Sequence, residues 1–275
     1  MKYCLYELAQ IDCILRAARR ILIASDFDGT LCAIADSPAD VHLSPAMLGI
    51  LRRIASSPAI RFAVISGRAI VDICGRVPLG IAFSGNHGLE IRGYGLDFEH
   101  SAARERRPLL ATACSVLAQT VERWPGAWIE DKGLSATLHY RKVDPRQHRA
   151  IRYEARQLMR RFGARFSLRA GNQALELRPK LAWDKGSALN YIREHTGPFD
   201  ACICIGDDRT DETMFRANRG CLNIRVGRDR PSAAGYYLSS PAEVAIFLSH
   251  ILDLCEFRSA AAGMGQASRL SEPRD

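Results

Sequence analysis

The sequence predicts an α/β fold in which helices cover both faces of a parallel sheet, with a smaller α+β module inserted into it. Three observations lead to this prediction: short, continuous apolar runs recur along the chain, helical patterns separate them, and residues 101–180 interrupt the alternation. Continuous apolar strands are typical of parallel sheets that are buried on both faces. The 275 residues can bury a sizeable core, as one large domain or two moderate ones.

Residues 21–88 predict the first strands and helices of this sheet. Three apolar runs predict strands: "ILIASDFD" (21–28), "IRFAVIS" (60–66) and "IAFSGNHG" (81–88). Helices are expected between them, over 44–57 and 68–75. Ser44 is the expected N-cap of the first helix and Pro45 its first helical residue.

The alternation resumes after residue 180. Helices are expected over 184–195, 209–218 and 241–252, with strands over 201–208 and 221–226. At the two ends of the chain, residues 1–20 predict a short amphipathic helix, and the small, polar segment from about Ser259 predicts a disordered tail.

The inserted module has a different pattern and most of the positive charge. Its expected elements are a helix over about 108–123, a hairpin over 127–141 that turns at Lys132–Gly133, a helix over 146–163 and a strand pair over 165–179. Residues 101–170 contain 15 Lys and Arg against 6 Asp and Glu, whereas the whole chain has a net charge of +8. This excess fits a solvated basic face, weak attraction to nucleic acid, or a module that meets an anionic substrate. No nucleic-acid-binding motif supports the second interpretation.

Composition argues against several classes of protein. No apolar stretch approaches the roughly 20 residues of a membrane span, and Glu7 and Asp12 interrupt the N-terminal segment, which argues against a signal peptide. Nine cysteines are scattered without a Cys-x-x-Cys pair, which favours a reducing compartment. We therefore expect a cytoplasmic monomer without a nucleic-acid or membrane partner.

Ligands of open parallel sheets bind outside the carboxyl ends of the strands, and four polar motifs fall there. The first contains Asp26 and Asp28, followed by Gly29 and Thr30. A carboxylate can attack phosphorus, and a second one nearby can protonate the leaving alkoxide. Two acids at this spacing repel each other, so a metal, a lysine or both are expected beside them. Taken alone, the motif also fits an acidic N-cap region.

The second and third motifs offer partners for an anion. Ser66-Gly67-Arg68 ends a strand, and its hydroxyl and backbone amides suit a phosphoryl oxygen, although an ordinary strand-to-helix turn has the same sequence. Lys185 begins a predicted helix, where the helix dipole disfavours a cation. This lysine either has an anion nearby or is solvated at the surface.

The fourth motif, "GDDRTDE", brings Asp207, Asp208, Asp211 and Glu212 together after a buried strand. Oxygen ligands without histidine or cysteine favour Mg²⁺. The alternative is an acidic first helical turn, which explains Asp211 and Glu212 better than Asp207.

In this order the four motifs resemble those of the haloacid dehalogenase superfamily of phosphohydrolases. The segments "GNHGLEIRG", "IEDKGLSATLHYR", "LELRP", "DKGSAL" and "GDDRTDE" further resemble the trehalose-6-phosphate phosphatase family over roughly residues 20–250. The resemblance implies a Rossmann-like core from residues 1–100 and 181–275, with residues 101–180 as an inserted α+β cap. It also implies Mg²⁺-dependent hydrolysis of trehalose 6-phosphate to trehalose and phosphate through an aspartyl-phosphate.

The resemblance implies catalytic roles for four residues. Asp26 is the expected nucleophile and Asp28 the expected general acid and base, while Ser66 and Lys185 are expected to hold the phosphoryl oxygens. The nucleophile and other oxygen donors would also bind Mg²⁺: Asp26, the backbone carbonyl of Asp28, and Asp207. Asp211 would orient a metal-bound water or the lysine.

Substrate contacts are implied for a further group of residues: Gly67, Arg68, Asn86, His87, Glu130, Lys132, Arg141 and Glu176. Relatives often have glutamate where Asn86 stands, so this position departs from the family pattern. Glu130 and Lys132 also fit an exposed hairpin pair, and Arg141 fits the basic surface. His139, in an alternating strand, is expected to be structural.

Two alternative functions stay open at this point. The same chemistry could act on another sugar phosphate, such as sucrose phosphate or mannosylglycerate phosphate. The chain could instead be a non-catalytic sugar-phosphate-binding subunit, although a degenerate relative is expected to lose at least one of Asp26, Asp28, Lys185 and Asp207, and all four are present.

Overall fold

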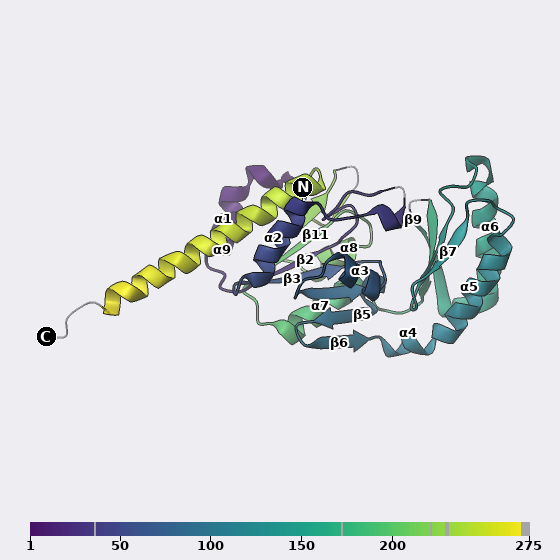
Figure 1. Cartoon of the computed structure of the whole chain (residues 1–275), viewed down its shortest axis with the longest axis horizontal. Coiled ribbons are helices and arrows are strands. Elements are labelled where there is room, and N and C mark those ends of the chain that lie inside the picture. Colours follow the sequence, from purple (N-terminus) through teal and green to yellow (C-terminus); the bar gives the residue numbers. More distant parts are fainter. Residues whose placement is uncertain (36, 172, 221, 229–230, 271–275) are drawn as a thin grey trace.

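A nine-stranded sheet forms the centre of the structure (Figure 1). The computed structural model describes the backbone of residues 1–270 except 36, 172, 221 and 229–230, and the side chains up to residue 258. Within this part, the strand order is β1-β13-β12-β11-β2-β3-β4-β5-β6, parallel as far as β4 and antiparallel at β5 and β6. The strands are β1 (Lys2–Tyr3), β2 (Ile21–Ser25), β3 (Ile60–Ile65), β4 (Ala82–Gly85), β5 (Glu90–Gly93), β6 (Leu96–Glu99), β11 (Ala201–Gly206), β12 (Leu222–Val226) and β13 (Tyr236–Leu238).

Helices cover both faces of this sheet, which confirms the predicted α/β fold (Figure 1). One face packs against α1 (Leu8–Arg16), α2 (Pro45–Ser56), α3 (Ile70–Arg76) and α9 (Pro241–Leu270). The other face packs against α7 (Lys185–Thr196) and α8 (Glu212–Ala217). The expected cap of α2 is confirmed, since the Ser44 hydroxyl accepts from the backbone N–H of Met47 at 3.1 Å.

The side chains of β2 show why the two layers form. Ile21 and Ile23 belong to the cluster on the α1 and α2 side, whereas Leu22 and Ala24 belong to the cluster on the α7 and α8 side. Successive side chains of a strand point to opposite faces, so a strand that is apolar at every position requires cover on both. The apolar run read from the sequence therefore places β2 at the centre of the sheet.

Some elements differ from the predictions. The expected N-terminal helix is shorter, since α1 begins at Leu8 and Lys2–Tyr3 pair with β13 as a strand. A disordered tail was expected from about Ser259, whereas the described backbone continues as α9 to Leu270. Residues 271–275 and residue 221, the start of one expected strand, lie outside the described part. None of the described helices combines the length and apolar character needed to cross a bilayer.

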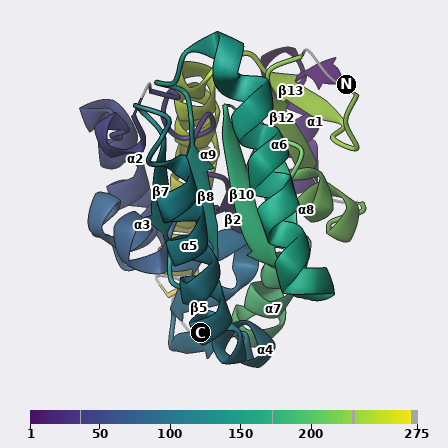
Figure 2. The same ribbon diagram turned by 90° about the vertical axis from the view of Figure 1, so that its right-hand side faces the viewer.

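The inserted module has its own antiparallel sheet, in the order β7-β8-β10-β9. Its strands are β7 (Trp128–Asp131), β8 (Ala136–His139), β9 (Phe166–Gly171) and β10 (Ala174–Pro179). Two helices, α5 (Arg107–Val121) and α6 (His148–Met159), cover the face that points away from the core (Figure 2). Ile129, Leu138 and Leu175 pack against these helices. The opposite face of the module's sheet is polar and points toward the core.

The two chain segments that join the module to the core run side by side. The first contains α4 (Ser101–Glu105), and Arg106 at its end donates from Nη1 to the carbonyl of Lys180 in the second, at 3.1 Å. The rings of His100 and Trp183 also meet, with centroids 5.3 Å apart. Both connections between the module and the core therefore lie at one edge of the module.

Candidate active site

The first and fourth motifs emerge next to each other because β2 and β11 are parallel neighbours. Ser25 is in register with Ile205, and the backbone N–H of Asp26 donates to the carbonyl of Ile205 at 2.9 Å. The carboxylates that follow the two strands converge: oxygens of Asp26, Asp207 and Asp211 all lie within 4.8 Å of one another. This confirms the expectation that the strand ends bring these acids together.

Lys185 lies among these acids. Its Nζ is 2.9 Å from Oδ1 of Asp26 and donates to Oδ1 of Asp211 at 2.7 Å, and only 1% of the residue is exposed. The lysine is the first residue of α7, which the Asp184 side chain caps by accepting from the backbone N–H of Ser187. The surface alternative for Lys185 is therefore wrong, and its anionic partners are the carboxylates of the first and fourth motifs.

Two glycines allow the acids to approach so closely. Gly29 has φ of +79°, and a Cβ built there would lie 2.3 Å from Oδ2 of Asp207. A Cβ at Gly206 would lie 2.4 Å from the Asp211 carboxyl carbon. Any larger side chain at either position would displace a carboxylate.

The crowding changes the protonation of the cluster. Burial and the neighbouring Asp211 raise the pKa of Asp26 well above its usual value, and Lys185 only partly opposes this. Burial and Asp211 likewise raise the pKa of Asp207 to about 7, although Thr30 donates to its Oδ1 at 3.1 Å. Asp211 and Asp26 raise the pKa of Lys185 against the effect of burial, so the lysine stays charged. One cation among three carboxylates leaves negative charge in excess.

A divalent cation fits this cluster. The donors are all carboxylate oxygens, and they lie within 4.8 Å of one another. Together the three carboxylates offer more negative charge than Lys185 neutralises. Hard oxygen donors of this kind suit Mg²⁺. Asp211 is already bound to Lys185 and accepts at Oδ2 from the N–H of Asp208, which suits an orienting role.

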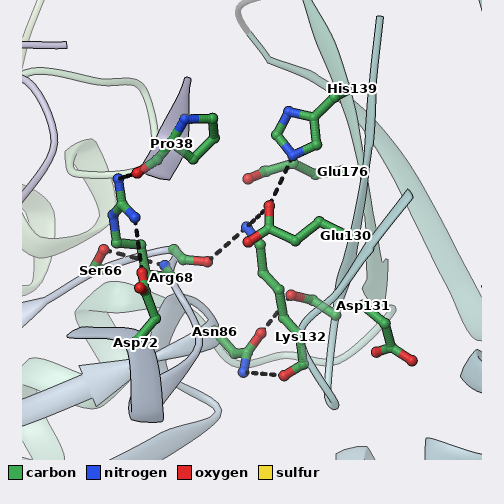
Figure 3. Close-up of polar contacts among 12 residues, drawn as sticks. Pro38, Ser66, Arg68, Asp72, Asn86, Glu130, Asp131, Lys132, His139 and Glu176 are labelled. Carbon is green, nitrogen blue, oxygen red and sulfur yellow. Dashed lines mark hydrogen bonds and ion pairs between the residues drawn. The ribbon is translucent and has the colours of Figure 1, made fainter. Parts of the chain in front are cut away.

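Asp28 is held by arginine. Arg68 donates from Nε to Oδ2 of Asp28 at 2.8 Å and from Nη2 to Oδ1 at 2.7 Å. The same guanidinium, 8% exposed as a residue, reaches Asp72 at 2.8 Å and the carbonyl of Pro38 at 3.0 Å (Figure 3). Arg68 also lines the cavity, and its two hydrogen bonds to Asp28 tie the proposed acid to the core.

Ser66 and Gly67 have different surroundings. The Ser66 hydroxyl is fully buried and accepts from the backbone N–H of Arg68 at 3.2 Å, so in this structure the serine does not line the cavity. Gly67 does line it, and its carbonyl accepts from Nζ of Lys132 at 3.2 Å. A Cβ at Gly67 would lie 2.4 Å from the His87 ring, which explains the glycine.

A cavity of about 1320 Å³ separates these core residues from the polar face of the module. Cross-strand register aligns Glu130, Thr137 and Glu176 on that face, because each alternate residue of β7, β8 and β10 points toward the core. Arg141 also lines the cavity, and its Nη1 donates to the carbonyl of Ala35 in the core at 3.0 Å. Small-molecule sites typically measure roughly 300–1,000 Å³, so this cavity has room for closure around a ligand.

Glu130 and Lys132 are not the exposed pair of the alternative interpretation. Their side chains are 30% and 10% exposed, and both lie on the cavity (Figure 3). Burial alone would raise the pKa of Glu130, but the hydrogen bond from His139 and the charge of Lys132 lower it. His139, which was expected to be structural, supports Glu130 through this hydrogen bond and also lines the cavity.

His87 links the two parts of the molecule. Its Nε2 donates to Oε1 of Glu176 at 3.2 Å, and burial lowers the pKa of His87 to about 3, so the imidazole is neutral. Burial opposes ionisation of Glu176, but His87 and Arg178 outweigh it and hold the pKa of this carboxyl well below its usual value. Glu176 is therefore an ionised acceptor on the cavity.

Asn86 also joins core and module, but away from the cavity. It is 1% exposed, accepts from the Ser135 hydroxyl at 2.5 Å and donates to the carbonyl of Lys132 at 3.1 Å and to Glu90 at 2.6 Å (Figure 3). All its polar atoms are engaged. In this structure the residue that departs from the family pattern contacts the module rather than the space for substrate.

Sequence reasoning missed three residues that support the acids. Thr30 donates to Asp207, as described above, and could have been found from its place directly after the first motif. Arg225 donates from Nη2 to the carbonyl of Asp207 at 2.5 Å, and Glu212 lies 3.4 Å from its Nη1. Arg225 carries no local signal, because a polar residue that alternates with apolar ones on a strand also fits a solvated face.

Solved structures with a similar fold include a haloacid dehalogenase-like hydrolase and a protein related to trehalose-6-phosphate phosphatase. A haloacid dehalogenase-like hydrolase from Bacteroides thetaiotaomicron matches with a TM-score of 0.59 at 20% identity, over 84% of this chain and 99% of that one. A crystal structure of a trehalose-6-phosphate phosphatase related protein matches with a TM-score of 0.75 at 25% identity, over 85% of this chain and 97% of that one. These comparisons confirm the haloacid dehalogenase-like fold.

Sequence comparison narrows this class of proteins to one family. A model of the family described as trehalose-phosphatase matches residues 24–241. Probable trehalose-phosphate phosphatase H from Arabidopsis thaliana is 30% identical over 268 residues, which cover 90% of this chain and 76% of that protein. Trehalose 6-phosphate phosphatase RA3 from Zea mays is 32% identical over 265 residues, covering 88% and 73%. The chain therefore belongs to the trehalose-phosphatase family.

Proposed function

We propose that this protein hydrolyses trehalose 6-phosphate to trehalose and inorganic phosphate through an aspartyl-phosphate on Asp26. Family membership supports the reaction, and one observation carries the mechanism: the Asp26 carboxylate lies 2.9 Å from the buried Lys185 ammonium at the edge of the cavity. A carboxylate next to a fixed cation can accept a phosphoryl group whose negative oxygens the cation stabilises.

In the first half-reaction an Asp26 oxygen attacks phosphorus and the bond from phosphorus to the sugar oxygen breaks. Asp28 gives a proton to that departing oxygen. Both oxygens of Asp28 accept from Arg68 in this structure, and each keeps a second lone pair on which the carboxyl can carry the proton. Lys185 holds a phosphoryl oxygen during the transfer.

In the second half-reaction a water molecule attacks the acyl-phosphate and Asp28 takes its proton. The bond from phosphorus to the Asp26 oxygen breaks, which releases phosphate and restores the carboxylate. Ser66 and the backbone at Gly67 are the further candidates to hold phosphoryl oxygens, and the serine would have to turn from the N–H of Arg68 to do so.

We assign Mg²⁺ to Asp26, the carbonyl of Asp28 and Asp207, with Asp211 as the orienting residue. When bound, the ion neutralises charge between the nucleophile and the anionic phosphoryl group. The excess negative charge of the three-carboxylate cluster supports this assignment.

The cap, residues 101–180 in this proposal, supplies the sugar contacts. Glu130, Lys132, Arg141 and Glu176 bring charged donors and acceptors to the cavity, where they can bind hydroxyl groups strongly once water is excluded. His87 supports Glu176 from the core side. Closure of the cap would complete this set around the disaccharide.

A substrate panel tests the assignment. Phosphate release from trehalose 6-phosphate should require Mg²⁺ and exceed that from sucrose 6-phosphate and glucose 6-phosphate. Equal turnover of simple hexose phosphates would instead favour the alternative that this is a general sugar-phosphate phosphatase. Activity that persists in excess chelator would contradict the assigned metal.

A non-catalytic role is the second candidate. A Candida albicans trehalose synthase regulatory protein C-terminal domain shares the fold with a TM-score of 0.66 at 12% identity, so the fold alone does not imply catalysis. The combination of Asp26, Asp28, Lys185 and Asp207 favours the enzyme. We further propose a cytoplasmic monomer without nucleic-acid or membrane partners; the scattered cysteines, which form no Cys-x-x-Cys pair in the sequence, support a reducing compartment. Light scattering after size exclusion tests the monomer.

A further inference from the structure

We propose that Trp128, backed by His139, forms an aromatic platform for the sugar ring farther from the phosphate and thereby favours a disaccharide over a monosaccharide. This inference rests on the proposed function and adds a specificity residue to it. Four features of Trp128 support it: the direction in which it points, the way its ring is fixed, its exposure and its position along the strand.

Trp128 points into the cavity because of strand alternation. It precedes Glu130 by two residues on β7, so both side chains lie on the same face of the cap sheet. On the neighbouring strand, His139 is in register with Trp128 and Thr137 with Glu130. All four line the cavity, whereas Ile129 between them packs in the core of the module.

The indole is fixed by stacking. The rings of Trp128 and His139 lie with centroids 4.2 Å apart and planes inclined by only 14°, and His139 Nε2 donates to Oε2 of Glu130 at 2.8 Å. The imidazole is thus held by a hydrogen bond on one side and supports the indole on the other. A platform fixed in this way loses little side-chain entropy when a ligand packs on it.

Exposure separates Trp128 from the other tryptophans. Trp128 is 45% exposed, whereas Trp124 is 7% exposed in the module's core and Trp183 packs against Phe98 where the module joins the core. A large apolar surface left open in an otherwise polar cavity suggests that a ligand covers it. A pyranose ring presents C–H groups on its faces, and packing these against indole removes apolar surface from water.

The position of Trp128 selects the outer ring. Lys132 contacts Gly67 of the core, so this end of the segment lies nearest the core. Glu130 and then Trp128 lie successively farther from it along β7. Trp128 lies four residues from Lys132, roughly 13 Å at the rise of an extended strand. The phosphoryl group is bound on the core side, so the platform meets the sugar ring most distant from it.

Substrate truncation tests the platform. Trp128→Ala should raise KM for trehalose 6-phosphate about 10-fold with little change in kcat, because the contact is the same in ground and transition states. Its kcat/KM for glucose 6-phosphate, which lacks the outer ring, should stay at the wild-type value. Trp128→Phe should retain most of the affinity, and His139→Ala should shift KM in the same direction by less.

Tyr153→Ala is the matched control, since Tyr153 is an exposed aromatic residue on α6, outside the cavity, and should change neither substrate. An equal loss on both substrates, or no change on trehalose 6-phosphate, would overturn the platform. Wild-type enzyme without activity on trehalose 6-phosphate would instead overturn the proposed function itself. Trehalose binding to Asp26→Asn, followed by indole fluorescence, gives a readout that does not depend on turnover; a response unchanged by Trp128→Phe contradicts the proposal.

Discussion

Arg68 holds Asp28 through two parallel hydrogen bonds, of 2.8 and 2.7 Å. The aspartate that should carry the proton is therefore oriented by a side chain 40 residues away in the sequence. Because Arg68 also binds Asp72 and the carbonyl of Pro38, its guanidinium is fixed on three sides. The planar fork, and not only the positive charge, sets the direction of the carboxyl group.

The first prediction concerns this arrangement. Arg68→Lys keeps the charge but cannot form the fork, and we expect kcat on trehalose 6-phosphate to fall by about 10- to 100-fold because the acid is misplaced. Steady-state kinetics with a thermal melt measure this effect. Asp72→Asn is the control and should cost less, because Asp72 binds Nη1 of Arg68 and Nε of Arg76 and does not contact Asp28 through the fork. Wild-type kcat in Arg68→Lys would show that the fork does not orient Asp28.

The second prediction concerns the nucleophile. Asp26→Asn should reduce phosphate release by about 10³-fold or more, because an amide cannot form the acyl-phosphate. The variant should be no less stable than wild type without metal, since one of three crowded carboxylates is removed while Lys185 keeps Asp211. Phosphate release and a thermal melt in chelator test both statements. Unchanged activity would refute the assigned nucleophile.

The third prediction concerns the buried cation. Lys185→Met leaves Asp26 and Asp211 without their cation in a buried site, and we expect a loss of about 3–5 kcal/mol in the free energy of unfolding. The double variant Asp26→Asn with Lys185→Met should lose less, because one of the unpaired charges is absent. Denaturant unfolding measures both, and Lys142→Met, at an exposed lysine, is the control. Equal losses in single and double variants would argue against coupling of this pair.

The fourth prediction concerns pH and metal. The pKa of Asp207 is raised to about 7 in the folded protein, so between the usual pKa of aspartate and pH 7 the metal-free folded state keeps a proton that the unfolded chain loses. The free energy of unfolding should therefore fall as pH rises through this window. Mg²⁺ binds the ionised acids, so its increase in Tm should be larger at pH 8 than at pH 5.5.

Asp207→Asn serves as the control for that experiment. It removes one of the two carboxyls with a raised pKa and should reduce the pH dependence of the metal-free protein and the gain from Mg²⁺, while Asp26 keeps the remaining pH dependence. A metal-free protein whose Tm rises steadily from pH 5 to 7 would contradict the raised pKa of Asp207.

The sequence contained enough information for the centre of the fold. Strands such as β2 and β11 are apolar at every position, and the pattern that results can only be buried on both faces. Among the strands that were missed, β5 and β6 have only four residues each and are partly exposed, so their patterns resemble those of loops. Their pairing follows from contacts across the sheet edge, which no local pattern records.

The candidate site was predictable to the same degree. The convergence of Asp26, Lys185 and Asp207 follows from parallel register, which places consecutive strand ends at one edge. The partners of these residues were not predictable, because Arg225 and Arg68 act through long-range hydrogen bonds that depend on side-chain conformation. For the same reason the sequence assigned Asn86 to the substrate, whereas the structure places it between core and module.

The adjacent connections at Arg106 and Lys180 have an evolutionary consequence. Everything between them could be exchanged for another polypeptide without interrupting the strand order that sets the reacting carboxylates beside Lys185. An ancestor with this arrangement could acquire new substrate preferences by diversifying one self-contained insert while inheriting its hydrolytic chemistry intact.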